Sequence, residues 1–326
     1  MKILYAIQGT GNGHVSRARE IIPYLRKYGN VDILISGTHA EVDVGAEVKY
    51  RFDGFGFVFG SKGGVDFRET WKRFNLRKFI TDVKNLPVRE YDVVINDFEP
   101  VCAWSCKLYR KFSVGMSHQS AYLSHKTPKI TGFHWGKIIM NHYAPASDYV
   151  AFHFEKYDHF IHTPVIRNEI RNLKPQNSGH YTVYLPDKVK EIPGSNWQIF
   201  SKHSKQHYKT NNAEVFPINN VLFQKSLANC EGLLTGGGFE GPAEALYLGK
   251  KLLAVPMHHQ YEQQCNALAL EKLGVPVIWK EHTFLEKLKN WVASSERIEI
   301  FFPDETEYII KNMIEKYGSE SFNKKL

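Results

Sequence analysis

The chain has 326 residues, of which 43% are hydrophobic and 23% are charged, a composition that excludes wholesale disorder and is typical of globular proteins. At roughly 100–200 residues per domain, this length predicts two domains. The net charge of +8 favours an anionic partner, which leaves a nucleotide, a phospholipid surface and a nucleic acid open. Residues 1–14 lack the long apolar region and cleavage site of a signal peptide, and no apolar run approaches the ~20 residues that span a bilayer. We therefore expect a cytoplasmic protein.

The first half of the chain alternates between predicted strands and helices. Residues 2–7 are almost wholly apolar, which is typical of a parallel strand covered on both faces. A glycine-rich turn follows, and then a helix is expected over residues 15–27. Residues 52–64, rich in glycine and aromatic residues, favour short strands or a loop. Further strands are predicted at residues 31–36, 92–95, 113–116 and 148–152, with a helix at 69–86.

A second alternation begins after the predicted linker at residues 156–167. The C-terminal segment, residues 304–317, repeats apolar side chains at helical spacing, so one face of that helix must pack on other parts of the protein. The pattern predicts an α/β fold with two doubly wound parallel-sheet domains, residues 1–160 and 161–302, and a terminal helix within 303–326 that packs back on the first. The expected strands of the second domain are residues 181–185, 198–201, 213–216, 232–234, 251–255 and 275–278.

The cysteines and acidic residues give no sign of a metal site. The four cysteines are too few and too scattered for a disulfide framework, and further ligands at zinc spacing are missing. The sequence also contains no Asp-x-Asp motif. We expect buried thiols, no metal and no cofactor. The four cysteines are Cys102, Cys106, Cys230 and Cys265.

The first glycine-rich loop, residues 9–14 (GTGNGH), follows a strand and opens a helix. Gly11 and Gly13 let the backbone approach a ligand closely, and the helix N-terminus offers free amide groups. The G-x-G-x-G spacing differs from the dinucleotide fingerprint, and no Gly-Lys-Ser/Thr follows, so NAD and P-loop readings are disfavoured. His14 lies at the carboxyl end of a strand, where a neutral imidazole suits a general base. The alternative is a histidine that only caps the helix.

The second glycine-rich loop lies in residues 234–246 (LTGGGFEGPAEAL). An apolar strand runs into three glycines and then a helix, which favours a cradle for a diphosphate. Glu244, about two turns into that helix, could accept hydrogen bonds from both ribose hydroxyls. The loop after the next strand presents carboxylate and amide groups that suit sugar hydroxyls. The candidate donor-binding residues of this half are Gly236, Gly237, Gly238, Glu240, Glu244, Glu262, Gln263 and Asn266.

These motifs resemble the signature of inverting nucleotide-sugar glycosyltransferases with two Rossmann-like domains facing across a cleft, the GT-B architecture. The chain is similar to the group that contains the peptidoglycan lipid-disaccharide GlcNAc transferase and the UDP-glycosyltransferases. Residues 163–167 (TPVIR) resemble the interdomain Pro-Val-Arg element of this group. The resemblance spans nearly the whole chain and is closest in the carboxyl-terminal half. It departs at Val15, where some relatives have proline after the histidine.

The resemblance implies a role for each matching position. His14 would deprotonate the acceptor hydroxyl, and the loop of Gly236, Gly237 and Gly238 would bind the diphosphate. Glu244 would bind the ribose, and Glu262 with Gln263 would hold the donor sugar. Arg167 would contact a phosphate, and the backbone at Phe216 and Ile218 would contact the base. In the family that this chain resembles, the base is usually uridine.

Asp97 ends the strand before Pro100 and has two interpretations of equal weight. It either orients His14 or touches the acceptor, or else it caps the helix that follows. The expected chemistry is a single displacement at the anomeric carbon, without a metal, in which the leaving diphosphate is stabilised by loop amides.

The acceptor and the donor sugar stay open at this point. A UDP-linked hexose such as GlcNAc, passed to a glycan, lipid-linked or small-molecule hydroxyl in cell-envelope polysaccharide or glycolipid synthesis, is the first interpretation. A nucleotide-sugar 2-epimerase using Asp97 and Glu99, and a non-catalytic nucleotide-sugar-binding protein, are the alternatives. Dispersed basic residues disfavour nucleic acid. The basic, aromatic stretch 71–79 either docks on anionic lipid at the inner face of the membrane or is a solvated helix face. A monomer and a dimer are both open.

Overall fold

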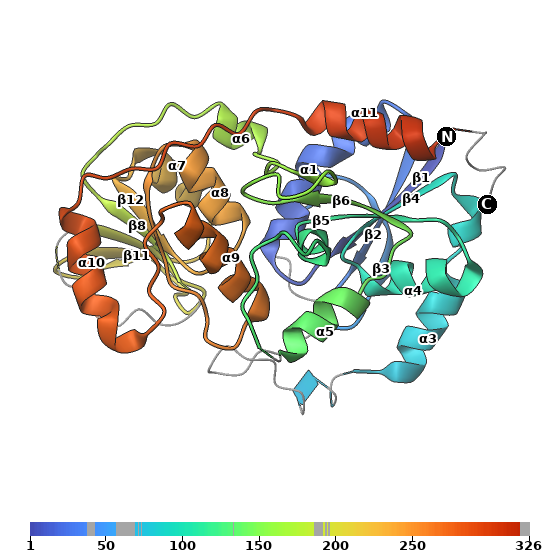
Figure 1. Cartoon of the computed structure of the whole chain (residues 1–326), viewed down its shortest axis with the longest axis horizontal. Coiled ribbons are helices and arrows are strands. Elements are labelled where there is room, and N and C mark those ends of the chain that lie inside the picture. Colours follow the sequence, from blue (N-terminus) through green and yellow to red (C-terminus); the bar gives the residue numbers. More distant parts are fainter. Residues whose placement is uncertain are drawn as a thin grey trace. The chain divides into compact units, whose positions relative to one another are not determined.

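The computed structural model of the chain describes residues 1–37, 43–56, 69–70, 72, 74–132, 134–185, 192, 194 and 196–319. The chain divides into two compact units. The first contains residues 1–127, 132–167 and 303–326, and the second contains residues 128–131 and 168–302. Each unit is built on its own sheet (Figure 1). In the described part of the chain, no helix combines the length and the apolar character needed to cross a membrane.

The sheet of the first unit has the strand order β3-β2-β1-β4-β5-β6-β7, and all its neighbouring strands run parallel. The direction in which strands are added reverses between β1 and β4, which makes this pair the topological switch point. The predicted doubly wound α/β class is confirmed. The strands are β1 (Lys2–Gln8), β2 (Asn30–Ser36), β3 (Val48–Phe52), β4 (Val93–Asp97), β5 (Val114–Ser117), β6 (Asp148–Phe152) and β7 (Ile161–His162).

Helices cover both faces of the first sheet. Figure 1 shows α1 and α11 together on one side and α3 with α4 on the other. Consecutive side chains of β1, from Ile3 to Ile7, are all fully buried, which explains why that strand is apolar throughout rather than alternating. The helices are α1 (Asn12–Arg26), α3 (Leu76–Asn85), α4 (Pro100–Tyr109), α5 (Trp135–His142) and α11 (Thr306–Tyr317), with short 3-10 turns η1 (Val88–Glu90) and η2 (Gln119–Leu123).

The prediction of one continuous helix over residues 69–86 is wrong. Helix α3 starts at Leu76, because the backbone of Asn75 leaves the helical conformation and its side-chain oxygen accepts a hydrogen bond of 3.0 Å from the amide of Lys78. The basic stretch 71–79 therefore contains the start of α3 and does not form one continuous helix face. Residues 71 and 73 of that stretch, and residues 57–64 of the glycine-aromatic segment, lie outside the described residues.

The sheet of the second unit has the order β10-β11-β9-β8-β12-β13, and only the short edge strand β10 is antiparallel to its neighbour. Its switch point lies between β8 and β12. Figure 1 shows α10 on one side of this sheet and α7 and α8 on the other. The strands are β8 (Tyr181–Tyr184), β9 (Trp197–Phe200), β10 (Tyr208–Lys209), β11 (Ala213–Phe216), β12 (Gly232–Thr235) and β13 (Lys251–Ala254). The helices are α6 (Asn168–Arg171), α7 (Asn220–Asn229), α8 (Glu240–Tyr247), α9 (Tyr261–Lys272) and α10 (Phe284–Ala293), with the 3-10 turn η3 (Glu281–Thr283).

The strand predicted at residues 275–278 is reduced to a single bridge. Val277 pairs with Ala254 at the end of β13, and the pairing does not extend into a strand. Pro276 carries no amide hydrogen, so this segment cannot donate at the position where a longer ladder would need it. All four cysteines of the chain are buried and free.

The C-terminal helix α11 belongs to the first unit, where it packs on α1. Ile310 and Met313 are 1% and 2% exposed, while Tyr308 on the opposite face is 62% exposed. The ends of the helix are held by an ion pair of 2.6 Å between Lys27 and Glu307 and by a hydrogen bond from the Tyr317 hydroxyl to Asp148. This apolar face therefore completes the core of the first unit.

Removing a buried side chain of α11 is expected to destabilise the first unit. Ile310→Ala leaves a cavity in a fully packed site and should lower the free energy of unfolding by about 2–5 kcal/mol. Tyr308→Ala, on the exposed face of the same helix, should change it by no more than about 0.5 kcal/mol. Chemical denaturation of both variants checks this, and equal effects would contradict the packing of α11 on the first unit.

Candidate functional site

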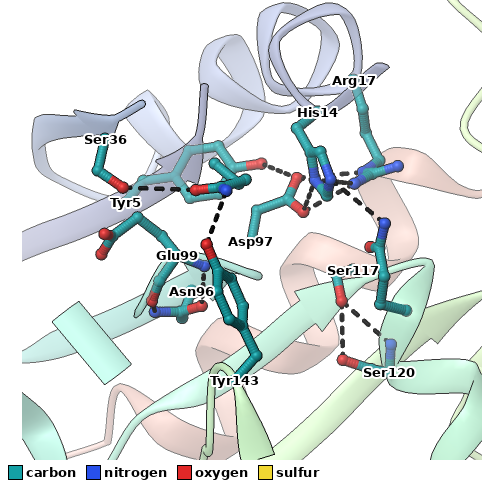
Figure 2. Close-up of polar contacts among 12 residues, drawn as sticks. Tyr5, His14, Arg17, Ser36, Asn96, Asp97, Glu99, Ser117, Ser120 and Tyr143 are labelled. Atoms are coloured by element: carbon teal, nitrogen blue, oxygen red, sulfur yellow. Dashed lines mark hydrogen bonds and ion pairs between the residues drawn. The ribbon is translucent and has the colours of Figure 1, made fainter. Parts of the chain in front are cut away.

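The switch point of the first unit brings two predicted residues together. Strand β1 leads through the glycine-rich loop into α1, which carries His14, and strand β4 ends at Asp97. Because β1 and β4 are parallel neighbours, both carboxyl ends meet at the same edge of the sheet. Ligands of open α/β sheets bind at such a point. Figure 2 shows His14, Arg17 and Asp97 converging there.

The loop before α1 is held close to the neighbouring strand. The amide of Gly9 donates to the carbonyl oxygen of Ser36 at 2.6 Å, and a Cβ on Gly9 would lie 2.7 Å from the side chain of Ile35. Gly11 has φ of 98°, a conformation that side chains rarely adopt. His14 is the third residue of α1 rather than its N-cap, and its ring nitrogens lie against Asp97 and Gln119. The alternative that His14 serves as a helix cap is therefore wrong.

His14 and Asp97 form a close pair. The Nδ1 atom of His14 lies 2.7 Å from Oδ1 of Asp97, whose side chain is fully buried, while His14 keeps 12% of its side chain exposed. A carboxylate only accepts, so the neutral imidazole must carry its proton on Nδ1. The lone pair is then on Nε2, which lies 3.3 Å from the side-chain nitrogen of Gln119. This tautomer is the one that a base acting through Nε2 requires.

Arg17, one helical turn after His14, binds the same carboxylate. Its Nη2 atom donates to both oxygens of Asp97, at 2.7 and 2.9 Å, and its Nε donates to Oδ2 at 3.2 Å. Burial tends to raise the pKa of Asp97, but the charge of Arg17, the electrostatic effect of the His14 ring and the hydrogen bonds from both side chains outweigh it and hold the pKa below its usual value. Asp97 is thus an anion inside the protein.

A tight turn after β4 aims Asp97 at His14. The amide group of Asn96 bonds both ways with the backbone of Glu99, at 2.7 and 2.8 Å, and Phe98 between them has φ of 55°. A left-handed phenylalanine is strained, and such residues gather at functional sites. Its ring lies parallel to the ring of His14, with centroids 6.4 Å apart. The strain therefore falls on the residue that links Asp97 to the next helix.

Glu99, rather than Asp97, caps the helix after β4. Its two carboxylate oxygens accept from the amides of Val101 and Cys102 at 2.8 and 2.6 Å. The helix-cap alternative for Asp97 is therefore wrong. Burial raises the pKa of Glu99 to about 7, against the lowering effect of bonds from Ser36 and from these backbone amides.

Buried polar side chains continue from Glu99 along the same sheet edge. Gln8 donates from its side chain to the hydroxyl of Tyr143 at 2.9 Å, and that hydroxyl donates to the carbonyl oxygen of Phe55. Ser36 and Tyr143 flank Glu99 in Figure 2. The edge of β1, β2 and β4 is thus polar although both faces of the sheet are apolar.

The second glycine-rich loop lies at the switch point of the second unit. It follows β12 and leads into α8, with Thr235 and Gly236 bonded to the carbonyl oxygen of Tyr184 at the end of β8. Gln263 and Asn266 of α9 form hydrogen bonds with both backbone polar groups of Gly237. The side-chain oxygen of Gln263 accepts from its amide at 3.2 Å, and the side-chain nitrogen of Asn266 donates to its carbonyl oxygen at 3.0 Å. The structure thus joins three residues that the sequence proposed separately.

The acidic candidates lie on the two helices that flank this loop. Glu240 is in the first turn of α8, and Glu244, one turn later, is only 4% exposed. Glu262 lies in the first turn of α9. The oxygen of Gln263 also accepts from the amide of Met257 at 3.1 Å, so backbone groups occupy it in this structure. The sugar-binding roles of these residues stay predictions.

The other donor-site candidates lie elsewhere in their units. Phe216 ends β11, and its ring stacks between those of Phe200 and His207, with centroids 5.2 and 4.5 Å away. Ile218 follows in the loop before α7 and is half-buried. Arg167 is 7% exposed and belongs, like Gly11 and Gly13, to the first unit.

Two residues of the His14 site had no place in the sequence prediction. Arg17 could have been found from its spacing, because residues three apart on a helix lie on one face. Gln119 carried no signal, since it comes from the turn η2, after β5, and is 105 residues from His14. In the described residues, no group of three or more His, Cys, Asp or Glu side chains is arranged to hold a metal.

Comparison with known proteins gives a family and a fold. The family model described as glycosyl transferase family 1 matches residues 1–294. No match was found among curated proteins.

Three similar solved structures illustrate the fold. A glycotransferase of kitacinnamycin is 12% identical, with a TM-score of 0.56 and coverage of 99% of this chain and 97% of its own. MurG of Acinetobacter baumannii is 13% identical, with a TM-score of 0.52 and coverage of 96% and 95%. A UDP-glucosyltransferase from Polygonum tinctorium is 11% identical, with a TM-score of 0.56 and coverage of 97% and 93%. These likenesses extend over both sheets and establish a GT-B fold.

Proposed function

Because this chain belongs to glycosyl transferase family 1, we propose that it transfers a hexose from a nucleotide sugar to a hydroxyl acceptor, with inversion at the anomeric carbon. The observation that carries this proposal is the 2.7 Å contact between His14 and buried Asp97. It leaves the lone pair of the imidazole on Nε2, the only ring nitrogen that Asp97 does not hold. A partly exposed imidazole in this tautomer can act as a general base.

The reaction proposed is one displacement. Nε2 of His14 takes the proton of the acceptor hydroxyl while the acceptor oxygen forms a bond to the anomeric carbon. The bond from that carbon to the diphosphate oxygen breaks, and its electron pair leaves with the nucleotide diphosphate. Asp97 stabilises the imidazolium that forms, because its carboxylate already accepts from Nδ1. Attack from the face opposite the leaving group inverts the configuration.

The second unit would hold the donor. Backbone amides at Gly236, Gly237 and Gly238 precede α8, whose N-terminus carries a positive partial charge. We propose that this loop and Arg167 of the first unit bind the diphosphate and stabilise its charge as it leaves, so that no metal is required. The amides of Gly236 and Gly237, which donate to Tyr184 and Gln263 in this structure, would exchange those partners for the diphosphate. Glu244 would then accept from the ribose hydroxyls, and Glu262 with Gln263 would bind the sugar.

The donor proposed first is a UDP-hexose such as UDP-GlcNAc. One similar structure, LpCGTa, is described in complex with UDP, and another is a UDP-glucosyltransferase. The acceptor proposed is a glycan, a lipid-linked sugar or a small-molecule hydroxyl of cell-envelope polysaccharide or glycolipid synthesis. A cytoplasmic location, at or near the inner face of the membrane, would suit such an acceptor.

The 2-epimerase alternative finds less support than transfer. It would need Asp97 and Glu99 as free acids and bases around a sugar. Glu99 instead gives both oxygens to backbone amides of α4, and Asp97 is closed in by His14 and Arg17. A binding protein without catalytic activity would not need a histidine whose Nε2 carries the lone pair.

Nucleotide-sugar binding is the direct test of the donor site. We expect a UDP-sugar, from a panel of nucleotide sugars, to raise the melting temperature and to bind in calorimetry. Glu244→Gln should weaken that binding roughly tenfold to hundredfold, because a hydrogen bond to a charged group contributes about 1.5–3 kcal/mol. Glu271→Gln, a control on α9 whose side chain bonds Trp279, should bind normally. If no nucleotide sugar binds, the donor-site proposal is wrong.

A further inference from the structure

The guanidinium of Arg17 is buried beside the proposed base. Arg17 is 2% exposed and Asp97 is 0% exposed, so both charges lie inside the protein and depend on each other. The Nη2 atom of Arg17 also lies 3.1 Å from Nδ1 of His14. Both nitrogens are donors directed at the same Oδ1 atom of Asp97, at 2.7 Å each. One carboxylate oxygen is therefore shared between a permanent cation and the imidazole.

This sharing changes what Asp97 can do for His14. A buried carboxylate alone next to an imidazole attracts a proton to the pair, because an isolated buried charge is costly. A guanidinium does not lose its proton in proteins, so Arg17 supplies a fixed positive charge at the same place. It cancels the charge of Asp97 and repels a second cation on His14. Both effects favour an ionised Asp97 and oppose a second positive charge beside it.

We propose that Arg17 is a positioning residue that sets the proton balance of the His14–Asp97 pair, keeping Asp97 ionised and His14 free of a second proton until an acceptor hydroxyl supplies it. The inference rests on the proposed role of His14 as the base. Arg17 acts through Asp97 and touches no substrate in this proposal. Without Arg17, the fixed positive charge that opposes proton uptake by the pair would be missing.

The other groups around the pair do not supply this charge. From β1, the hydroxyl of Tyr5 lies 3.5 Å from Oδ2 of Asp97, and burial followed by the nearby Asp97 charge raises its pKa, so it stays neutral. From η2, Gln119 is uncharged. The ring of Phe98 lies parallel to that of His14, with centroids 6.4 Å apart, and the ring of Phe152 lies 5.9 Å from the guanidinium carbon of Arg17. Among the described contacts of Asp97, Arg17 is the one with a permanent positive charge.

Proton uptake by the pair tests the proposal without any substrate. In full-length protein labelled with ¹⁵N-histidine and ¹³C-aspartate, the ring nitrogens of His14 and the carboxyl carbon of Asp97 report protonation separately. Arg17→Gln keeps a hydrogen-bond donor and removes the charge. We expect the pair to take up its proton at a pH higher than in the wild type by roughly one unit or more. Arg17→Lys keeps the charge and should stay closer to the wild type than Arg17→Gln does.

The control is Arg89→Gln, also in the first unit, where the arginine bonds the carbonyl oxygen of Tyr109 near the opposite end of β4. It should leave the titration unchanged. Unchanged proton uptake in Arg17→Gln, or an equal shift in Arg17→Lys, would overturn the proposal. If Arg17→Gln does not fold, the wild-type titration decides: Asp97 must stay ionised where His14 becomes protonated, and the reverse order refutes the inference.

Because this readout needs neither donor nor acceptor, it separates two failures. A shifted titration in a protein that binds no nucleotide sugar would support the electrostatic role and contradict the proposed transferase function. Normal nucleotide-sugar binding with an unshifted titration would do the opposite. Once an acceptor is known, the acidic limb of the pH–rate profile of Arg17→Gln should move to higher pH, while a purely structural role would lower activity equally at every pH.

Discussion

His14→Ala is expected to lower kcat for sugar transfer by about 10²–10⁴-fold, the usual contribution of a positioned general base. The variant removes the imidazole whose Nε2 is proposed to accept the proton of the acceptor hydroxyl. It leaves the ion pair between Arg17 and Asp97 in place, so the unit should remain folded. Initial rates with a UDP-sugar and a suitable acceptor measure the effect.

Two controls separate lost chemistry from lost structure. Donor affinity, measured by calorimetry, should be the same in His14→Ala and the wild type, because the proposed donor groups other than Gly11, Gly13 and Arg167 belong to the second unit. His142→Ala, an exposed histidine at the end of α5, should retain full activity. Transfer by His14→Ala at more than a tenth of the wild-type rate would remove His14 from the role of base.

Gly237→Ala is expected to abolish donor binding. A Cβ on Gly237 would overlap the carbonyl oxygen of Gln263 and lie 2.8 Å from the Cβ of Gln263. These atoms belong to the start of α9 and cannot move as the end of a flexible side chain could. The substitution must therefore separate the loop from α9, and it should break the hydrogen bonds that Gln263 and Asn266 make to Gly237.

The neighbouring glycine provides a matched control for this prediction. A Cβ on Gly238 would meet no atom within 4 Å, so Gly238→Ala should leave the fold of the loop unchanged. We expect Gly237→Ala to lower the melting temperature and to lose its response to UDP-sugars, whereas Gly238→Ala should keep the wild-type melting temperature. Equal melting temperatures and equal donor binding in Gly237→Ala and the wild type would show that the loop does not depend on this contact.

The sequence determined the class of fold because that information is local. Strand-length apolar runs followed by glycine and helical spacing specify βα units wherever they occur, and the family match and the GT-B likeness confirm the interpretation. The same local reasoning failed where one residue changed the outcome. Asn75 starts α3 later than periodicity suggested, and Pro276 limits the predicted strand at 275–278 to one bridge.

The sequence also located both glycine-rich loops and singled out His14, since a loop between a strand and a helix is visible in the order of residues. The sequence did not identify the partner of His14. Asp97 had two interpretations, because a carboxylate before a helix can equally be a helix cap. Only the turn in which Glu99 takes the capping role decided between them. The donor-binding roles of Glu244, Glu262 and Gln263 remain predictions.

By itself, then, the sequence determined two α/β units, their family and the loops that carry its candidate chemistry. The tertiary structure alone decided the partners of His14. Asp97 is 83 residues away and Gln119 is 105 residues away, and both reach it because β1 lies beside β4, which lies beside β5. Strand order follows from the packing of the whole sheet rather than from any segment, so the shared carboxylate of His14 and Arg17 appears only once that order is known.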